Sequence, residues 1–142
     1  ARSIGIELVN PGHEFGYLAF PDAQMESVIE LCRDIRSRHA IPPARVLGHS
    51  DVAPDRKQDP GELFDWRRLA DEGLGVWPEK LSEDEDPDET IARSLLTGIG
   101  YNPDTTLPVL LTAFQRHFRP ALVNGALDAE TFALLRTRAA IS

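Results

Sequence analysis

Residues 48–61 read GHSDVAPDRKQDPG, and this stretch decides how the rest of the chain is interpreted. Prolines at positions 54 and 60, together with a glycine at each end, exclude a helix or a central strand and predict a long loop with a constrained path. Imidazole and carboxylate groups are ligand types that suit zinc. A loop stiffened by prolines can bring His49 and Asp59 to one point, although ten residues separate them.

A lysine in the same loop adds a positive charge near these two side chains. Lys57 lies two residues before Asp59, so its ammonium group can reach the same point and stabilise a developing negative charge. The competing interpretation is a surface loop of solvated charges. The residues of the loop by themselves leave both interpretations open.

A longer run that includes this loop resembles a known family. Residues 48–66, GHSDVAPDRKQDPGELFDW, resemble the zinc loop of N-acetylmuramoyl-L-alanine amidases of the AmpD and AmiD type, which hydrolyse peptidoglycan. The resemblance implies that His49 and Asp59 bind Zn²⁺ and that Lys57 is catalytic. It also implies a peptidoglycan or muropeptide substrate.

The first apolar segment, Ile4 to Val9, is a strand by composition. Strict alternation places Glu7 on the face opposite Ile6 and Leu8, where an edge-strand charge facing water is one interpretation. The run SIGIELVN, however, resembles the family strand whose glutamate acts as general base on the attacking water. The resemblance therefore implies a catalytic role for Glu7.

A loop with several aromatic side chains follows this strand. Its sequence NPGHEFGY resembles a stretch of some family members that lines the substrate groove. The resemblance makes His13, Phe15 and Tyr17 candidates for substrate contact, and simple loop packing is the alternative for His13.

The spacing of apolar residues predicts an α/β domain around this loop. Residues 22–39 carry a helical stripe that suits packing on a sheet, and Cys32 in that stripe is expected to be a small buried side chain. Residues 45–48 are expected to form a short buried strand, and residues 64–70 a short helix. Trp66 is expected in the core, with a wall for a sugar as the alternative. Together with the family resemblance, this pattern implies an amidase domain with a mixed sheet and packing helices, incomplete at its N-terminus.

The second half of the chain predicts a separate all-α unit. Residues 80–89 are acidic and contain a proline, which is typical of a linker. Three helical patterns follow at residues 90–97, 107–118 and 129–139, with Asp128 as the N-cap of the third. The runs LLTAFQRHF and NGALDAETFALL resemble a three-helix peptidoglycan-binding domain. His117 is expected on the helix surface.

These patterns divide the chain into an amidase portion (1–79), an acidic linker (80–89) and a peptidoglycan-binding domain (90–142). The net charge of −8 comes mostly from seven acids within residues 79–89, and no basic patch suggests nucleic acid. No apolar run is long enough to span a membrane. Cys32 is the only cysteine, so no intramolecular disulfide can form.

The family pattern contains one further zinc ligand that has no counterpart here. It is a histidine on a strand before the glutamate strand, whereas this sequence supplies only His49 and Asp59 as candidate ligands. Catalytic zinc sites use three protein ligands. We therefore expect either a missing N-terminal segment that supplies the third ligand, or a non-catalytic protein that recognises peptidoglycan. The expected location is the periplasm or cell envelope of a bacterium.

Overall fold

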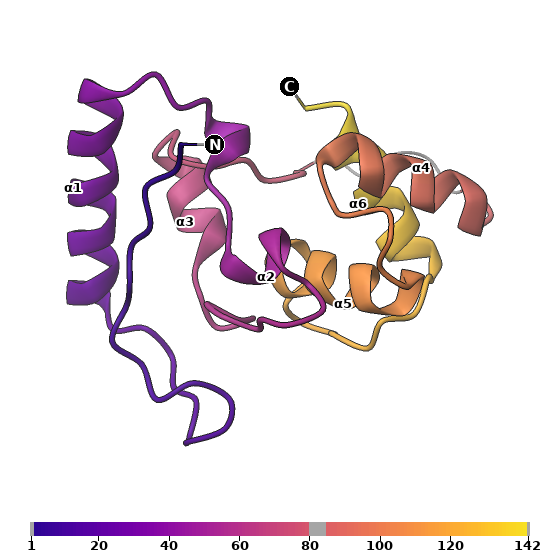
Figure 1. The fold of residues 1–142 in the computed structure, drawn as a ribbon, viewed down its shortest axis with the longest axis horizontal. Helices are drawn as coiled ribbons and strands as arrows, with labels where there is room; N and C mark the ends of the chain where they lie inside the picture. Colours follow the sequence, from indigo (N-terminus) through magenta and orange to yellow (C-terminus); the bar gives the residue numbers. More distant parts are fainter. Residues whose placement is uncertain (1, 80–84, 142) are drawn as a thin grey trace.

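The computed structural model describes residues 2–79 and 85–141, and its regular elements are helices (Figure 1). In chain order they are α1 (Asp22–Arg38), the 3₁₀ turn η1 (Pro43–Arg45), α2 (His49–Val52), α3 (Trp66–Asp71), α4 (Glu89–Ile99), α5 (Leu107–Phe118) and α6 (Ala129–Ala139). Within the described residues, no helix is both long and apolar enough to cross a membrane.

The predicted mixed sheet is wrong for this structure, because residues 2–79 and 85–141 contain no strand. Residues 4–9 are irregular rather than paired, and residues 43–45 form a 3₁₀ turn where a strand was expected to begin. An alternating apolar pattern indicates which face of a segment is buried, but a strand also requires backbone hydrogen bonds to a neighbour. In the described part of the chain, neither segment makes such bonds.

The prediction that residues 48–61 contain no helix is also wrong for one turn. Helix α2 begins at His49, and the Asp51 carboxylate accepts a hydrogen bond from the Gly48 amide at 2.9 Å, as an acidic residue in the first helical turn can. Pro54 and Pro60 restrict the backbone only near their own positions, which leaves residues 49–52 free to form a turn.

The first hydrophobic core forms between α1 and α3. The predicted stripe on α1 is buried and packs against side chains that follow the loop; the buried members are Met25, Val28, Ile29, Cys32, Phe64, Trp66, Leu69 and Leu74. The helix prediction for residues 22–39 and the core position of Trp66 are therefore confirmed. Burial raises the pKa of the Cys32 thiol, which agrees with its role as a small apolar side chain.

The second core forms among α4, α5 and α6, and the three helical predictions are confirmed. Asp128 caps α6 as predicted, because its side chain accepts a hydrogen bond from the Thr131 amide at 2.8 Å. The buried members of this core include Leu96, Phe114 and Phe132, whereas Ile91 is 39% exposed. Ile91 lies in the first turn of α4, and the buried residues of this helix are Ala92 and Leu96.

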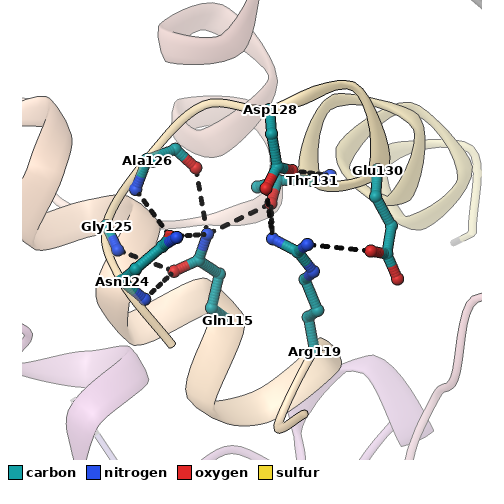
Figure 2. A network of polar contacts seen from close by, with 8 residues as sticks. All are labelled: Gln115, Arg119, Asn124, Gly125, Ala126, Asp128, Glu130 and Thr131. Atoms are coloured by element: carbon teal, nitrogen blue, oxygen red, sulfur yellow. Dashed lines mark hydrogen bonds and ion pairs between the residues drawn. The ribbon is translucent and has the colours of Figure 1, made fainter. Parts of the chain in front are cut away.

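A buried glutamine organises the connection between α5 and α6 (Figure 2). The side-chain oxygen of Gln115 accepts hydrogen bonds from the amides of Asn124 and Gly125 at 2.9 and 2.8 Å. Its side-chain nitrogen donates to the Ala126 carbonyl at 3.0 Å and to the Thr131 hydroxyl at 3.1 Å. One side chain thus replaces backbone pairing along a loop that has no regular structure of its own.

The two cores are in contact with each other. Trp77 packs against both of them, and α2 lies against α5 (Figure 1). Residues 80–84 of the predicted linker lie outside the described residues. The division into a portion 1–79, a linker 80–89 and a domain 90–142 therefore stays a prediction, but α2 and α5 pack directly on one another.

Candidate active site

The loop predicted to gather chemical groups does bring two of them together. The imidazole Nδ1 of His49 lies 3.1 Å from a carboxylate oxygen of Asp59. The loop is closed behind them by a hydrogen bond of 3.0 Å from the Ser50 amide to the Asp59 carbonyl. Both side chains are at least half exposed, at 50% and 65%, so the pair is open to solvent and to a ligand.

This pair offers the donor types that zinc prefers, one imidazole nitrogen and one carboxylate oxygen. Among residues 2–79 and 85–141, no group of three or more histidine, cysteine, aspartate or glutamate side chains is placed to hold a metal ion. His49 and Asp59 thus fit a zinc ion as two of its ligands, and their role stays a prediction.

Glu7 and Lys57 are both exposed side chains. Within the described residues, neither is joined to His49 or Asp59 by a hydrogen bond or an ion pair. The backbone around each of them is anchored, because the Val9 carbonyl accepts a hydrogen bond from the Gln24 side chain and the Lys57 amide donates to the Ala53 carbonyl at 2.9 Å. The catalytic roles of Glu7 and Lys57 stay predictions.

Two of the three predicted substrate-binding residues hold the loop in place. The Tyr17 hydroxyl donates to the Pro60 carbonyl at 2.7 Å and accepts a hydrogen bond from the Leu63 amide at 2.9 Å. His13 stacks on the Tyr17 ring, with 4.1 Å between ring centroids, and its Nε2 lies 2.9 Å from the Glu62 carboxylate. Desolvation raises the pKa of the Tyr17 hydroxyl. These contacts hold the segment that directly follows Asp59.

We call the contacts of His13 and Tyr17 with residues 60–63 the clamp. Phe15, the third predicted substrate-binding residue, is not part of the clamp. The Phe15 ring is 77% exposed, and no ring contact involves it within the described part of the chain. Substrate contact by His13, Phe15 and Tyr17 stays a prediction. For His13 and Tyr17, the structure adds a role in holding the loop.

The clamp leaves no room for a side chain at Gly61. Its backbone has φ of +83°, and an added Cβ would lie 2.4 Å from the Tyr17 hydroxyl. Gly61→Ala is therefore expected to lower the free energy of unfolding by about 2–4 kcal/mol, from backbone strain and overpacking together. Urea denaturation measures this change.

Gly12→Ala is the matched control for that substitution. Gly12 also has a positive φ, of +76°, but nothing lies within 4 Å of an added Cβ. We expect only the backbone cost there, about 1–2 kcal/mol. Equal losses in the two variants would contradict the clamp.

Sequence reasoning missed the most buried polar cluster near the loop. Asp51 is 7% exposed; one of its carboxylate oxygens accepts from the Tyr101 hydroxyl at 2.6 Å, and the other lies 2.7 Å from Nδ1 of His117. We call Asp51, Tyr101 and His117 the interface node. One sequence feature could have indicated the position of Asp51. An acidic residue three positions after a glycine N-cap can accept a hydrogen bond from the amide of that glycine.

The prediction that His117 lies on the helix surface is wrong. Its side chain is 3% exposed and is sandwiched between the rings of Trp66 and Phe118, at centroid distances of 4.0 and 3.8 Å. The pattern of α5 alone indicates the face that packs on α4 and α6. The second face of α5 is buried by α2 and Trp66, which are distant in sequence.

The hydrogen bonds and charges of the interface node favour the ionised form of Asp51. Burial by itself would raise the pKa of the Asp51 carboxyl, but the charge and hydrogen bond of His117, with those from Tyr101 and Gly48, lower it overall. Burial and the neighbouring Asp51 raise the pKa of Tyr101 well above its usual value. Arg138 is 3% exposed and interacts electrostatically with Asp51. Asp51 is thus held as a buried carboxylate.

Comparisons with known proteins find similarity over most of the chain. Residues 1–62 match the family model described as N-acetylmuramoyl-L-alanine amidase. The N-acetylmuramoyl-L-alanine amidase AmiD of Escherichia coli is 40% identical, and the alignment covers 93% of this chain and 55% of AmiD. The 1,6-anhydro-N-acetylmuramyl-L-alanine amidase AmpD of Escherichia coli is 41% identical over 47% of this chain and 34% of AmpD.

Two solved structures are also similar to this chain. E. coli AmiD in complex with the substrate anhydro-N-acetylmuramic acid-L-Ala-D-γ-Glu-L-Lys has a TM-score of 0.77 and 39% identity, over 86% of this chain and 53% of that one. AmpDh3 from Pseudomonas aeruginosa in complex with anhydromuramic pentapeptide has a TM-score of 0.77 and 32% identity, over 87% and 54%. The chain spans about half the length of these two relatives. It is homologous to the AmiD and AmpD amidases, and its residues 1–62 match the N-acetylmuramoyl-L-alanine amidase family.

Proposed function

We propose that this protein hydrolyses the amide bond that joins N-acetylmuramic acid to L-alanine in peptidoglycan or muropeptides. Water adds to the lactyl carbonyl carbon and the C–N bond breaks, which leaves a carboxylate on the sugar and a free amine on L-alanine. The proposal is carried by one observation, the pairing of His49 with Asp59 at 3.1 Å in a chain homologous to amidases.

The proposed roles follow the resemblance described above. His49 and Asp59 would hold a zinc ion as two of the three protein ligands that catalytic zinc sites use. When bound, the ion would polarise the carbonyl and lower the pKa of water. Glu7 would accept a proton from the attacking water and pass it to the leaving amine, and Lys57 would stabilise the developing oxyanion.

The exposure of the pair supports a large substrate. A muropeptide must approach the pair from solvent, and both side chains are open to it. The aromatic loop that carries Phe15 follows the segment of Glu7 in the chain, so we propose that its exposed ring contacts the sugar or the stem peptide. We further propose that α4–α6 bind peptidoglycan and that the protein works in the bacterial periplasm or cell envelope.

Product analysis tests the proposal. The purified protein is incubated with anhydro-N-acetylmuramic acid-L-Ala-D-γ-Glu-L-Lys, the ligand in the AmiD structure, after chelator treatment and again after addition of Zn²⁺. We expect two products in the mass spectrum, the anhydro sugar acid and a tripeptide with a free alanine amine, and only in the presence of the metal.

Two histidine variants make the assay specific. His49→Ala should abolish the products, whereas His39→Ala is the control, because His39 is an exposed histidine at the end of α1. Binding of the muropeptide without cleavage by the wild-type protein would favour the alternative of a non-catalytic peptidoglycan-recognition protein. Cleavage at another bond, or cleavage by His49→Ala, would overturn the proposal.

A further inference from the structure

We propose that Tyr101 and His117, which belong to the C-terminal helical unit, are positioning residues for His49, acting through Asp51. The inference rests on the proposed function, because it gives the C-terminal unit a part in building the site. Its basis is the geometry of the interface node and the shortness of the helix that carries His49.

Helix α2 cannot hold its own orientation. It spans His49–Val52, which is one turn, and isolated helices of this length are unstable in water. Its position must therefore come from contacts with the rest of the chain. Asp51 supplies three buried contacts, because its carboxylate has hydrogen-bond partners at the Gly48 amide, the Tyr101 hydroxyl and His117.

Two of the three partners of Asp51 come from outside the loop. Tyr101 follows α4 and is 4% exposed, and His117 lies in the last turn of α5. The third partner, the Gly48 amide, immediately precedes His49. The node thus connects the C-terminal helices to the backbone at the start of α2 through one carboxylate.

The packing around the node limits its freedom to move. His117 lies between two aromatic rings, of which Trp66 belongs to the first core and Phe118 to the second. Gly48 is also enclosed, because an added Cβ would lie 2.9 Å from Pro60 and 3.2 Å from Trp66. A shift of α5 would therefore be transmitted to α2 and to the side chain that α2 presents.

Two measurements test the inference: the affinity of the protein for Zn²⁺ and the NMR resonances of the His49 ring nitrogens. Affinity is measured by competition with a chromophoric chelator, and the ring nitrogens of His49 are observed by two-dimensional NMR without metal, assigned with His49→Ala. We expect His117→Leu to weaken Zn²⁺ binding by about 10- to 100-fold, the usual size of an effect on groups that orient a metal ligand. Tyr101→Phe, which removes one oxygen, should give a smaller loss in the same direction.

A conservative variant and a structural control separate positioning from general stability. His117→Asn retains an N–H donor near the place of Nδ1, so it should restore most of the affinity that His117→Leu loses. Val109→Ala lies on the same helix at a half-buried position away from the node. It should lower the Tm and leave both the Zn²⁺ affinity and the His49 resonances unchanged.

The outcomes distinguish this inference from the proposed function. If the wild-type protein cleaves no muropeptide but His117→Leu and Tyr101→Phe shift the His49 resonances, the positioning role stands and the amidase function fails. If both variants are folded and leave the His49 resonances and the Zn²⁺ affinity at wild-type values, the inference is overturned. If His117→Leu does not fold, Tyr101→Phe decides alone.

Discussion

Replacing Glu7 by glutamine is expected to lower kcat for amide hydrolysis by about 100- to 10,000-fold, the usual contribution of a general base. Glutamine keeps the size and the hydrogen-bonding capacity of the side chain but cannot accept the proton of water. Glu7 is exposed, so the free energy of unfolding should change by less than about 0.5 kcal/mol. Steady-state kinetics on the muropeptide, with urea denaturation in parallel, measure both quantities.

Glu30→Gln provides the matched control for Glu7→Gln. It removes the same charge from an exposed position on α1, outside the loop proposed to contact the substrate. We expect wild-type kcat and KM for this variant. A Glu7→Gln protein that retains wild-type kcat would assign the proton transfer to another group and leave Glu7 as a solvated charge.

The largest expected effect on stability comes from Gln115→Leu. The side chain is fully buried, and its amide bonds to the loop at the amides of Asn124 and Gly125 and the carbonyl of Ala126 (Figure 2). Leucine is of similar size, so no large cavity forms, but these backbone groups lose their partners. Unsatisfied polar groups cost about 1–3 kcal/mol each, and the low end applies here because the three backbone groups are only part-buried. The expected loss in the free energy of unfolding is about 3–5 kcal/mol.

Gln24→Leu is the control for that substitution. Gln24 is also a helical glutamine, but within residues 2–79 and 85–141 its side chain makes one hydrogen bond, a solvent-exposed one to the Val9 carbonyl. Urea denaturation should show a change of less than about 1 kcal/mol for this variant. A similarly small loss for Gln115→Leu would mean that water or a rearranged loop satisfies the backbone groups.

The helices were the part of the fold that local sequence predicted well. The bounds of α5 and α6 agree with the apolar spacing, and Asp128 caps α6 as expected. These features depend on residues within a few positions of one another, since helical hydrogen bonds and caps are local. The strands were predicted wrongly because pairing requires a second segment, which an alternating pattern does not specify.

The candidate site also combines features that the sequence suggested with features that it did not. A loop that brings His49 and Asp59 together was one of two interpretations of its residues, and in the structure the two side chains lie 3.1 Å apart. Their function as metal ligands, and the roles of Glu7 and Lys57, stay predictions that come from resemblance. The clamp of Tyr17 on the Pro60 carbonyl was not expected, because it joins residues 43 positions apart.

Residues near one another in the chain were enough to predict α1, α4, α5 and α6 and the Asp128 cap, because helical hydrogen bonds and caps are local. Only the tertiary structure decided that Asp51 and His117, 66 positions apart, form a buried pair. Most buried polar side chains are hydrogen-bonded, and the partners of Asp51 at Tyr101 and His117 come from distant parts of the chain. No pattern within α2 or within α5 contains both members of the pair, so the interface node became visible only when the two helices were packed together.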